Sequence, residues 1–149
     1  LGGSAATDAR VIKFIKYDDE DQVDGDPGLM YAPKRSITGK SWHVVDIYVS
    51  RAFTLGVRVV GPLQGGRGLD QRLYGWYGGL WDRRGNQVQS GDTADSDPNT
   101  DDWSILHGRV WNYGQAFSGS APFNYRLDAS DMTPGAYTGT VTFTLSSNP

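Results

Sequence analysis

The chain has 149 residues, a formal net charge of -3 and no cysteine. That length fits a single domain whose core needs neither metal nor disulfide, and the lack of cysteine excludes a thiolate metal site and a cysteine nucleophile. The negative charge offers a nucleic-acid backbone no general attraction, and no run of about 18 apolar residues predicts a membrane span. Frequent glycine (20 residues) together with 5 Trp, 8 Tyr and 5 Phe favours a β-rich domain with many turns.

Residues 1–8 are mostly small and are predicted to form a flexible leader, and residues 9–149 are predicted to form the single domain. The chain starts with Leu rather than Met, which fits either a removed export signal or a trimmed form. Apolar residues then alternate with polar ones over 9–17, which predicts a strand. Ile12 and Phe14 fall on one face of it, and Val11, Ile15 and Tyr17 fall on the other.

This first strand has two interpretations. It can complete the sandwich of its own chain, or it can be lent to a neighbouring subunit, because strand addition needs an apolar strand behind a flexible leader. The sequence alone does not decide whether residues 9–17 pair within or between chains.

Acidic residues gather in 18–28 and again in 90–102. Carboxylate oxygens suit calcium, but the spacing matches no EF-hand loop, so solvated loops are the preferred interpretation and no metal or other cofactor is predicted. The calcium ligands considered are Asp21, Asp24, Asp26, Asp95, Asp97, Asp101 and Asp102.

Two strands are predicted at 42–50 and 53–61, where apolar residues alternate. His43 falls in the first of them with no catalytic partner in a recognisable pattern, so it is interpreted as a strand residue. The glycines at 65, 66 and 68 predict a turn, because no Lys-Ser/Thr follows them as in a phosphate-binding loop.

The segment 73–82 combines aromatic residues with glycines. Trp76, Tyr77 and Trp81 could form a flat stacking surface for sugar rings. They could equally be core residues packed over glycines of neighbouring strands, and this second interpretation is preferred. Further strands are predicted at 87–89, 103–111 and 123–127, with a loop of small residues at 118–122.

The last predicted strand is the clearest. In 137–145, Tyr137, Val141, Phe143 and Leu145 alternate with threonines, as in a half-buried strand. Pro134 and Gly135 precede Tyr137, and this combination resembles the tyrosine corner of Greek-key sandwiches, in which the hydroxyl bonds back to the upstream chain.

No catalytic constellation is recognisable: there is no HExxH, no GxSxG and no cysteine, so the protein is not expected to be an enzyme. Nor does the sequence contain an internal repeat or a convincing helix.

The ending PGAYTGTVTFTL resembles the C-terminal strand of bacterial pilin and spore-coat-U-type subunits, including chaperone–usher pilins. The resemblance implies an immunoglobulin-like antiparallel β-sandwich that is exported to the cell surface. It also implies that residues 9–17 act as a donor strand and that Tyr137, Val141, Phe143 and Leu145 border the groove of the acceptor. The implied partners are other copies of the chain, a periplasmic chaperone and an usher.

The sequence therefore predicts an all-β surface-filament subunit that polymerises by strand donation. A secreted carbohydrate-binding or adhesin module is the alternative, and an accessory or capsid-type domain is a third.

Overall fold

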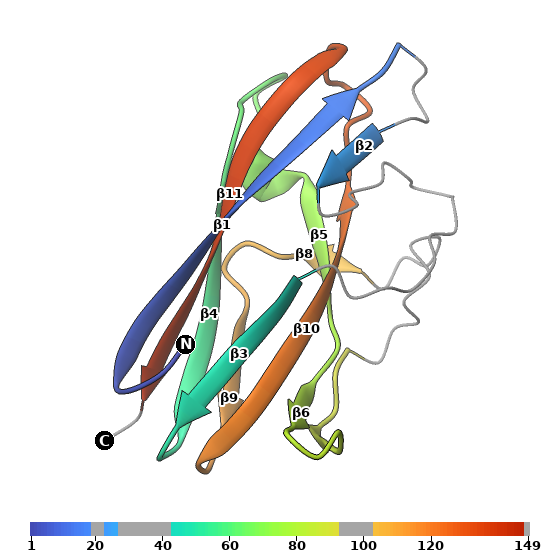
Figure 1. The fold of residues 1–149 in the computed structure, drawn as a ribbon. Coiled ribbons are helices and arrows are strands. Elements are labelled where there is room, and N and C mark those ends of the chain that lie inside the picture. Colours follow the sequence, from blue (N-terminus) through green and yellow to red (C-terminus); the bar gives the residue numbers. More distant parts are fainter. Residues whose placement is uncertain (19–22, 27–42, 93–102, 148–149) are drawn as a thin grey trace.

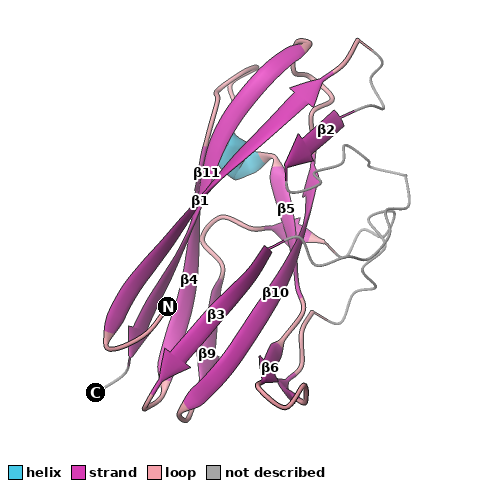
Figure 2. Cartoon of the chain, viewed as in Figure 1, coloured by secondary structure: helices cyan, strands magenta, loops and turns pink. Residues whose placement is uncertain are grey.

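The computed structural model describes residues 1–18, 23–26, 43–92 and 103–147. Within these ranges the chain is all-β, with a single 3-10 turn, η1 (Leu69–Gln71), as the only helical element. The described part contains no helix long and apolar enough to cross a bilayer. Two antiparallel sheets pack as a β-sandwich (Figures 1 and 2).

The first sheet, called the β11 sheet, has the order β2-β1-β11-β4-β9. Its strands are β1 (Ala5–Lys16), β2 (Val23–Asp26), β4 (Phe53–Val60), β9 (Val110–Tyr113) and β11 (Gly135–Ser147). The long first and last strands lie side by side over their whole length (Figure 1). The first and last strands of the described chain are therefore neighbours inside this sheet, and neither of them is an edge strand.

The second sheet, called the β10 sheet, is built on the long strand β10, which pairs with β3 on one edge and with β5 and β6 on the other. Its strands are β3 (His43–Val49), β5 (Leu73–Tyr77), β6 (Leu80–Asp82), β7 (Gln87–Gln89), β8 (Ser104–Ile105) and β10 (Phe117–Leu127). Outside the named strands, Gly2 bridges to Tyr48 in parallel, so the N-terminal residues reach from the β11 sheet to the edge of the β10 sheet.

The core lies between the sheets and follows the alternation of the strands. In β3, β4 and β11 every second residue is buried, as the period of a strand requires. Phenylalanines meet across the two layers: the rings of Phe123 and Phe143 lie 4.7 Å apart. The predicted all-β architecture with antiparallel sheets is thereby confirmed at the level of the sandwich.

Four segments differ from the sequence prediction. The single strand predicted at 103–111 is wrong, because this segment contains two strands of different sheets, β8 and β9, with a turn at 107–108 between them. The loop predicted at 118–122 is wrong, because these residues belong to β10. Their small side chains have a packing role: a Cβ on Gly119 would collide with the backbone of Trp81 and Asp82 on the neighbouring strand. β2 interrupts the predicted acidic loop, since the side chain of Val23 is buried in the core. β1 begins at Ala5 and so includes the last residues of the predicted leader, which pair through their backbone with β11.

Candidate functional site: the seam between the first and last strands

Among the described residues, the seam between β1 and β11 is the longest strand pairing, and it joins distant parts of the chain. It runs antiparallel from Ala5 opposite Ser146 to Lys16 opposite Gly135. On its other edge, β1 pairs with the short strand β2 over Lys13 to Lys16. β1 therefore occupies a slot between β11 and β2, and the single chain fills this slot with its own strand.

The side of β1 that faces the core carries Ile12 and Phe14, both buried, as the alternation predicts. The ring of Phe14 stacks on that of Tyr137 with centroids 5.3 Å apart. On β11, Val141, Phe143 and Leu145 are fully buried.

The opposite side of β1 is open. Val11 and Ile15 are 57% and 44% exposed, and Tyr17, which follows the end of β1, is 38% exposed. The residues predicted for the donor strand thus divide into a buried set, which fills the slot, and an exposed set, which does not.

A polar group closes one end of the slot. Arg10 Nη2 lies 2.8 Å from Asp8 Oδ2 and donates a second hydrogen bond, also of 2.8 Å, to the carbonyl oxygen of Val44 on β3. Because β1 and β3 belong to different sheets, this side chain ties the two layers together along the open side of the sandwich. The hydrogen bond from Arg10 holds the pKa of Asp8 below its ordinary value, although partial burial acts in the opposite direction.

Two further buried polar residues lie near this pair. His43 Nδ1 is 2.7 Å from the hydroxyl of Tyr125, and the two rings meet edge to face. Burial raises the pKa of Tyr125, and the charges of Arg10 and Asp8 act on it with opposite signs. His43 is thus a strand residue with a polar partner in the core, in agreement with its interpretation from the sequence.

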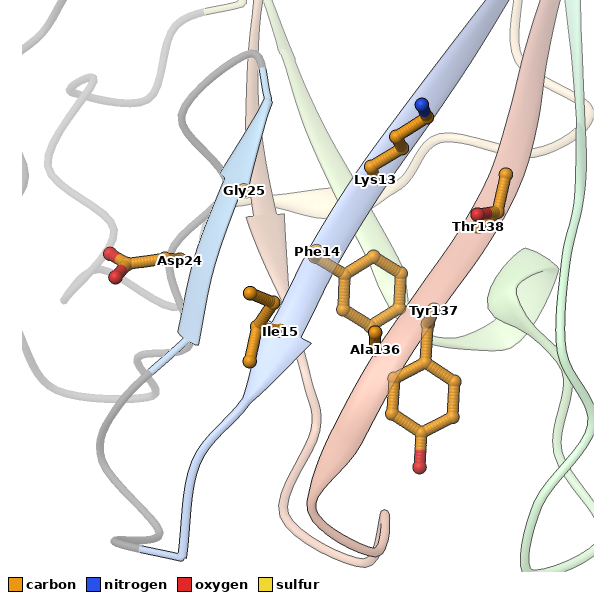
Figure 3. Close-up of a pocket in the computed structure, with 8 residues that line it drawn as sticks. All are labelled: Lys13, Phe14, Ile15, Asp24, Gly25, Ala136, Tyr137 and Thr138. Atoms are coloured by element: carbon orange, nitrogen blue, oxygen red, sulfur yellow. The ribbon is translucent and has the colours of Figure 1, made fainter.

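A shallow pocket of about 500 Å³ lies at the other end of the slot (Figure 3). Three neighbouring strands line it, with Lys13, Phe14 and Ile15 from β1, Asp24 and Gly25 from β2, and Ala136, Tyr137 and Thr138 from β11. The stacked rings of Phe14 and Tyr137 form its apolar part, whereas the carboxylate of Asp24 points away from them (Figure 3). Asp24 instead accepts a hydrogen bond of 2.9 Å from the hydroxyl of Tyr17.

The tyrosine corner predicted before β11 is present. The hydroxyl of Tyr137 donates to the carbonyl oxygen of Thr133 and accepts a hydrogen bond of 2.6 Å from Gln64 Nε2. The amide of Thr133 donates to Gln64 Oε1 at 2.9 Å. Gln64 therefore fastens the corner to the loop that follows β4 and fixes where β11 begins.

An ion-pair network beneath this corner was not visible in the sequence. Arg72 is fully buried and bonds to Asp131, and Arg67 pairs with both Asp128 and Asp131. These contacts hold the pKa of Asp131 well below its ordinary value, chiefly through the hydrogen bond from Arg72. No local motif indicates the network, because the arginine and the aspartate of each ion pair are 59 to 64 residues apart in the sequence.

The three aromatic residues proposed for sugar stacking do not form one surface. Tyr77 is only 2% exposed and packs in the core against Trp111 and Phe123, so its place in a stacking surface is wrong. Successive residues of β5 face opposite sides of the sheet, so Trp76 lies on the side away from Tyr77 and is partly buried. Trp81 of β6 is 36% exposed. The indole of Trp81 donates to the carbonyl oxygen of Gly78.

A second, polar pocket of about 420 Å³ lies on the side of the sandwich away from β1. Arg109 and Asp92 form a two-pronged ion pair there, at 2.6 and 2.9 Å, and Arg109 also donates to the carbonyl oxygen of Gly75. Gln89 Nε2 donates to the carbonyl oxygen of Asn112 across the two sheets. These polar groups satisfy one another's hydrogen bonds. We therefore interpret the pocket as a set of structural contacts that holds the two sheets together on this side of the sandwich.

Within the described ranges, no group of three or more His, Cys, Asp and Glu side chains is placed to hold a metal ion. Of the residues considered for calcium, Asp21, Asp95, Asp97, Asp101 and Asp102 lie outside the described residues. Comparison of the chain with protein-family models, with curated proteins and with solved structures found no match.

Proposed function

We propose that the protein is a structural subunit of an extracellular filament, with an immunoglobulin-like sandwich that polymerises by lending β1 to the next copy. The observation that carries the proposal is the twelve-residue pairing of β1 with β11. In the assembled state the same pairing would join two chains.

The free-energy change of such an exchange is small, because β1 would make the same contacts in the slot of another copy as it makes in its own. Ile12 and Phe14 would fill the slot of a neighbour as they fill their own. The equilibrium between monomer and multimer then depends on how the protein concentration compares with the effective concentration of a strand tethered to its own slot. For short flexible linkers this effective concentration is in the millimolar range.

The contacts of β1 also make the exchange slow in a folded monomer. Its buried apolar side chains and its backbone bonds to β11 and β2 must be broken before the strand can leave. Assembly would therefore take place as the chain folds after export, and a periplasmic chaperone and an usher that keep the slot open are the partners we propose for this step.

A staple across the seam tests the proposal. Val11 and Thr140 are register partners on the outer face, and the chain has no cysteine of its own. In the Val11→Cys/Thr140→Cys variant, a short thiol cross-linker applied to dilute monomer would lock β1 in its own slot. Refolded at high concentration, the unlinked variant should form multimers in light scattering, and the stapled variant should stay monomeric.

The matched control is Val11→Cys/Val110→Cys. Val110 is 56% exposed, close to the 57% of Val11, but it lies on β9 beyond β11 and β4. The linker cannot span these strands within one monomer, so treatment should leave assembly intact. Monomeric behaviour of the unlinked chain at every concentration would count against strand donation.

A sugar-binding module remains a second candidate because Trp81 is exposed and Trp76 lies near it, with Gly78 in contact with both. Quenching of tryptophan fluorescence by oligosaccharides, and its loss in Trp81→Ala, would support this candidate. An unchanged spectrum with all sugars tried would count against this candidate.

A further inference from the structure

The core-facing side of β1 is not uniformly apolar. Reading every second residue, it presents Asp8, Arg10, Ile12, Phe14 and Lys16. An acid and a base therefore precede two apolar residues, and a buried base follows them: Lys16 is only 4% exposed. This order distinguishes one register of β1 in the slot from registers shifted by two residues, which a plain alternation of apolar residues would not do.

The slot has a matching order. At the level of Arg10 it offers the carbonyl oxygen of Val44, with the bonded pair His43 and Tyr125 close by. One step further, Ile12 lies opposite Gly139, whose missing side chain leaves room for Leu69. Beyond that, Phe14 stacks on Tyr137. Polar groups of β1 thus meet polar groups of the slot, and apolar groups meet apolar ones.

A shift of one residue would turn every core-facing side chain of β1 to the solvent and is excluded by the pattern. A shift of two residues keeps the faces and is the real competitor. In one direction it would bring Arg10 opposite Gly139, into the apolar part of the slot, where its charge would have no acceptor. In the other direction it would bring Ile12 to the level of the Val44 carbonyl and leave that acceptor unused.

We infer that the Asp8–Arg10 pair fixes the register of β1 in the slot and restricts the accepted strand to that of a second copy of this chain. This inference rests on the proposed strand donation for its partner, but the register function applies equally when β1 fills its own slot. A foreign strand with apolar residues at these positions would lack the donor to the Val44 carbonyl oxygen and would lose this tie between the two sheets. The result is a homopolymer with one fixed repeat.

Cysteine pairs can read the register directly. In register, Val11 lies opposite Thr140, and the two shifted arrangements would place it opposite Thr138 or Thr142. All of these side chains belong to the outer face, so cysteines there leave the core untouched. Val11→Cys is combined in turn with cysteine at 138, 140 or 142, and each double variant is treated with the same short linker.

With the natural Asp8 and Arg10, linkage should be confined to the pair 11/140. With Arg10→Leu, linkage at 138 or 142 should rise to a level comparable with that at 140. Arg10→Lys, which keeps the charge and a donor, should restore the preference for 140. Lys13→Leu is the control, because Lys13 lies on the exposed face of the same strand.

Two results would overturn the inference: exclusive 11/140 linkage in Arg10→Leu, or equal linkage at all three positions in the natural sequence. If Arg10→Leu does not fold, Asp8→Asn serves as the second variant with the same expected loss of preference. The size of the linked product separates the two proposals. Linkage within one chain gives a monomer and linkage between chains gives multimers, whereas the position linked reports only the register.

Discussion

At the scale of single residues, the contacts around Tyr137 decide how β11 enters the sheet. Its hydroxyl bonds to Thr133 and Gln64, while its ring stacks on Phe14 of β1. Tyr137→Phe keeps the ring and removes the hydrogen bonds. Because two partners then lose a bond at a partly buried site, we expect the free energy of unfolding to fall by about 1–3 kcal/mol in urea titrations.

Tyr113→Phe is the control for this variant. Among the residues that the structure describes, the hydroxyl of Tyr113 accepts a hydrogen bond from the exposed Gln115 alone, so its removal should change the unfolding free energy by less than about 0.5 kcal/mol. Equal effects of the two substitutions would show that the corner does not stabilise the fold.

Gly139 is a second residue with a testable role. A Cβ there would overlap Leu69, which is fully buried, and would approach the carbonyl oxygen of Val60 to 3.1 Å. We expect Gly139→Ala to destabilise the protein by about 1–3 kcal/mol, as overpacking does in other cores. Thermal unfolding measures the change.

Gly56 on β4 offers the opposite case, since nothing lies within 4 Å of a Cβ placed on it. Its φ is not in the left-handed region, so alanine needs no change of backbone. Gly56→Ala should therefore be neutral or stabilise the protein by up to about 1 kcal/mol. A loss as large as that of Gly139→Ala would contradict the packing argument.

At the scale of elements, aspartates on loops and strands anchor neighbouring segments, and this makes stability depend on acid. The pKa values of Asp8, Asp128 and Asp131 all lie below their ordinary value in the folded chain. A carboxylate with a depressed pKa stabilises the fold above its unfolded pKa of about 3.9, and this contribution is lost as the pH falls through the folded pKa. The melting temperature should thus be level near neutrality and decline below about pH 4.

Asp131→Asn should lower the melting temperature at neutral pH, because Arg72 remains buried without its charged partner. The same variant should flatten the decline in acid. Asp46 forms no ion pair with another described residue. Asp46→Asn should therefore leave the decline of the melting temperature in acid as steep as it is in the natural protein. If Asp131→Asn left the decline of the melting temperature in acid unchanged, this would contradict the contribution of Asp131 to the acid dependence of stability.

The elements also show how far the sequence could lead. The period of two residues was enough for β1, β3, β4 and β11, because one face of each packs on the core and the other faces outward. The same period did not predict the strand at 118–122. The small residues there allow β10 to pack closely against its neighbour, and they do not form a turn. The Asp8–Arg10 pair was missed because its meaning depends on the Val44 carbonyl oxygen, which the fold brings over from the other sheet.

At the scale of the whole molecule, one arginine on each open side of the sandwich connects the two layers. Arg109 does so on one side through its ion pair with Asp92, and Arg10 does so on the other through its hydrogen bond to the Val44 carbonyl oxygen. Only the second of these depends on β1. A chain that lends β1 away would open that side alone and present the slot, while the rest of the core stays closed.

The most direct test of strand donation uses two different chains, one with Val11→Cys and one with Thr140→Cys. They are mixed unfolded, refolded together at high concentration and linked, and the products are weighed by mass spectrometry. Strand donation predicts a linked heterodimer at twice the 16.3 kDa of one chain. The amount of this dimer should be well above the amount formed when Val11→Cys is mixed with Val110→Cys. Linked dimer no more abundant than in this control would contradict it and would make β1 a permanent part of its own chain.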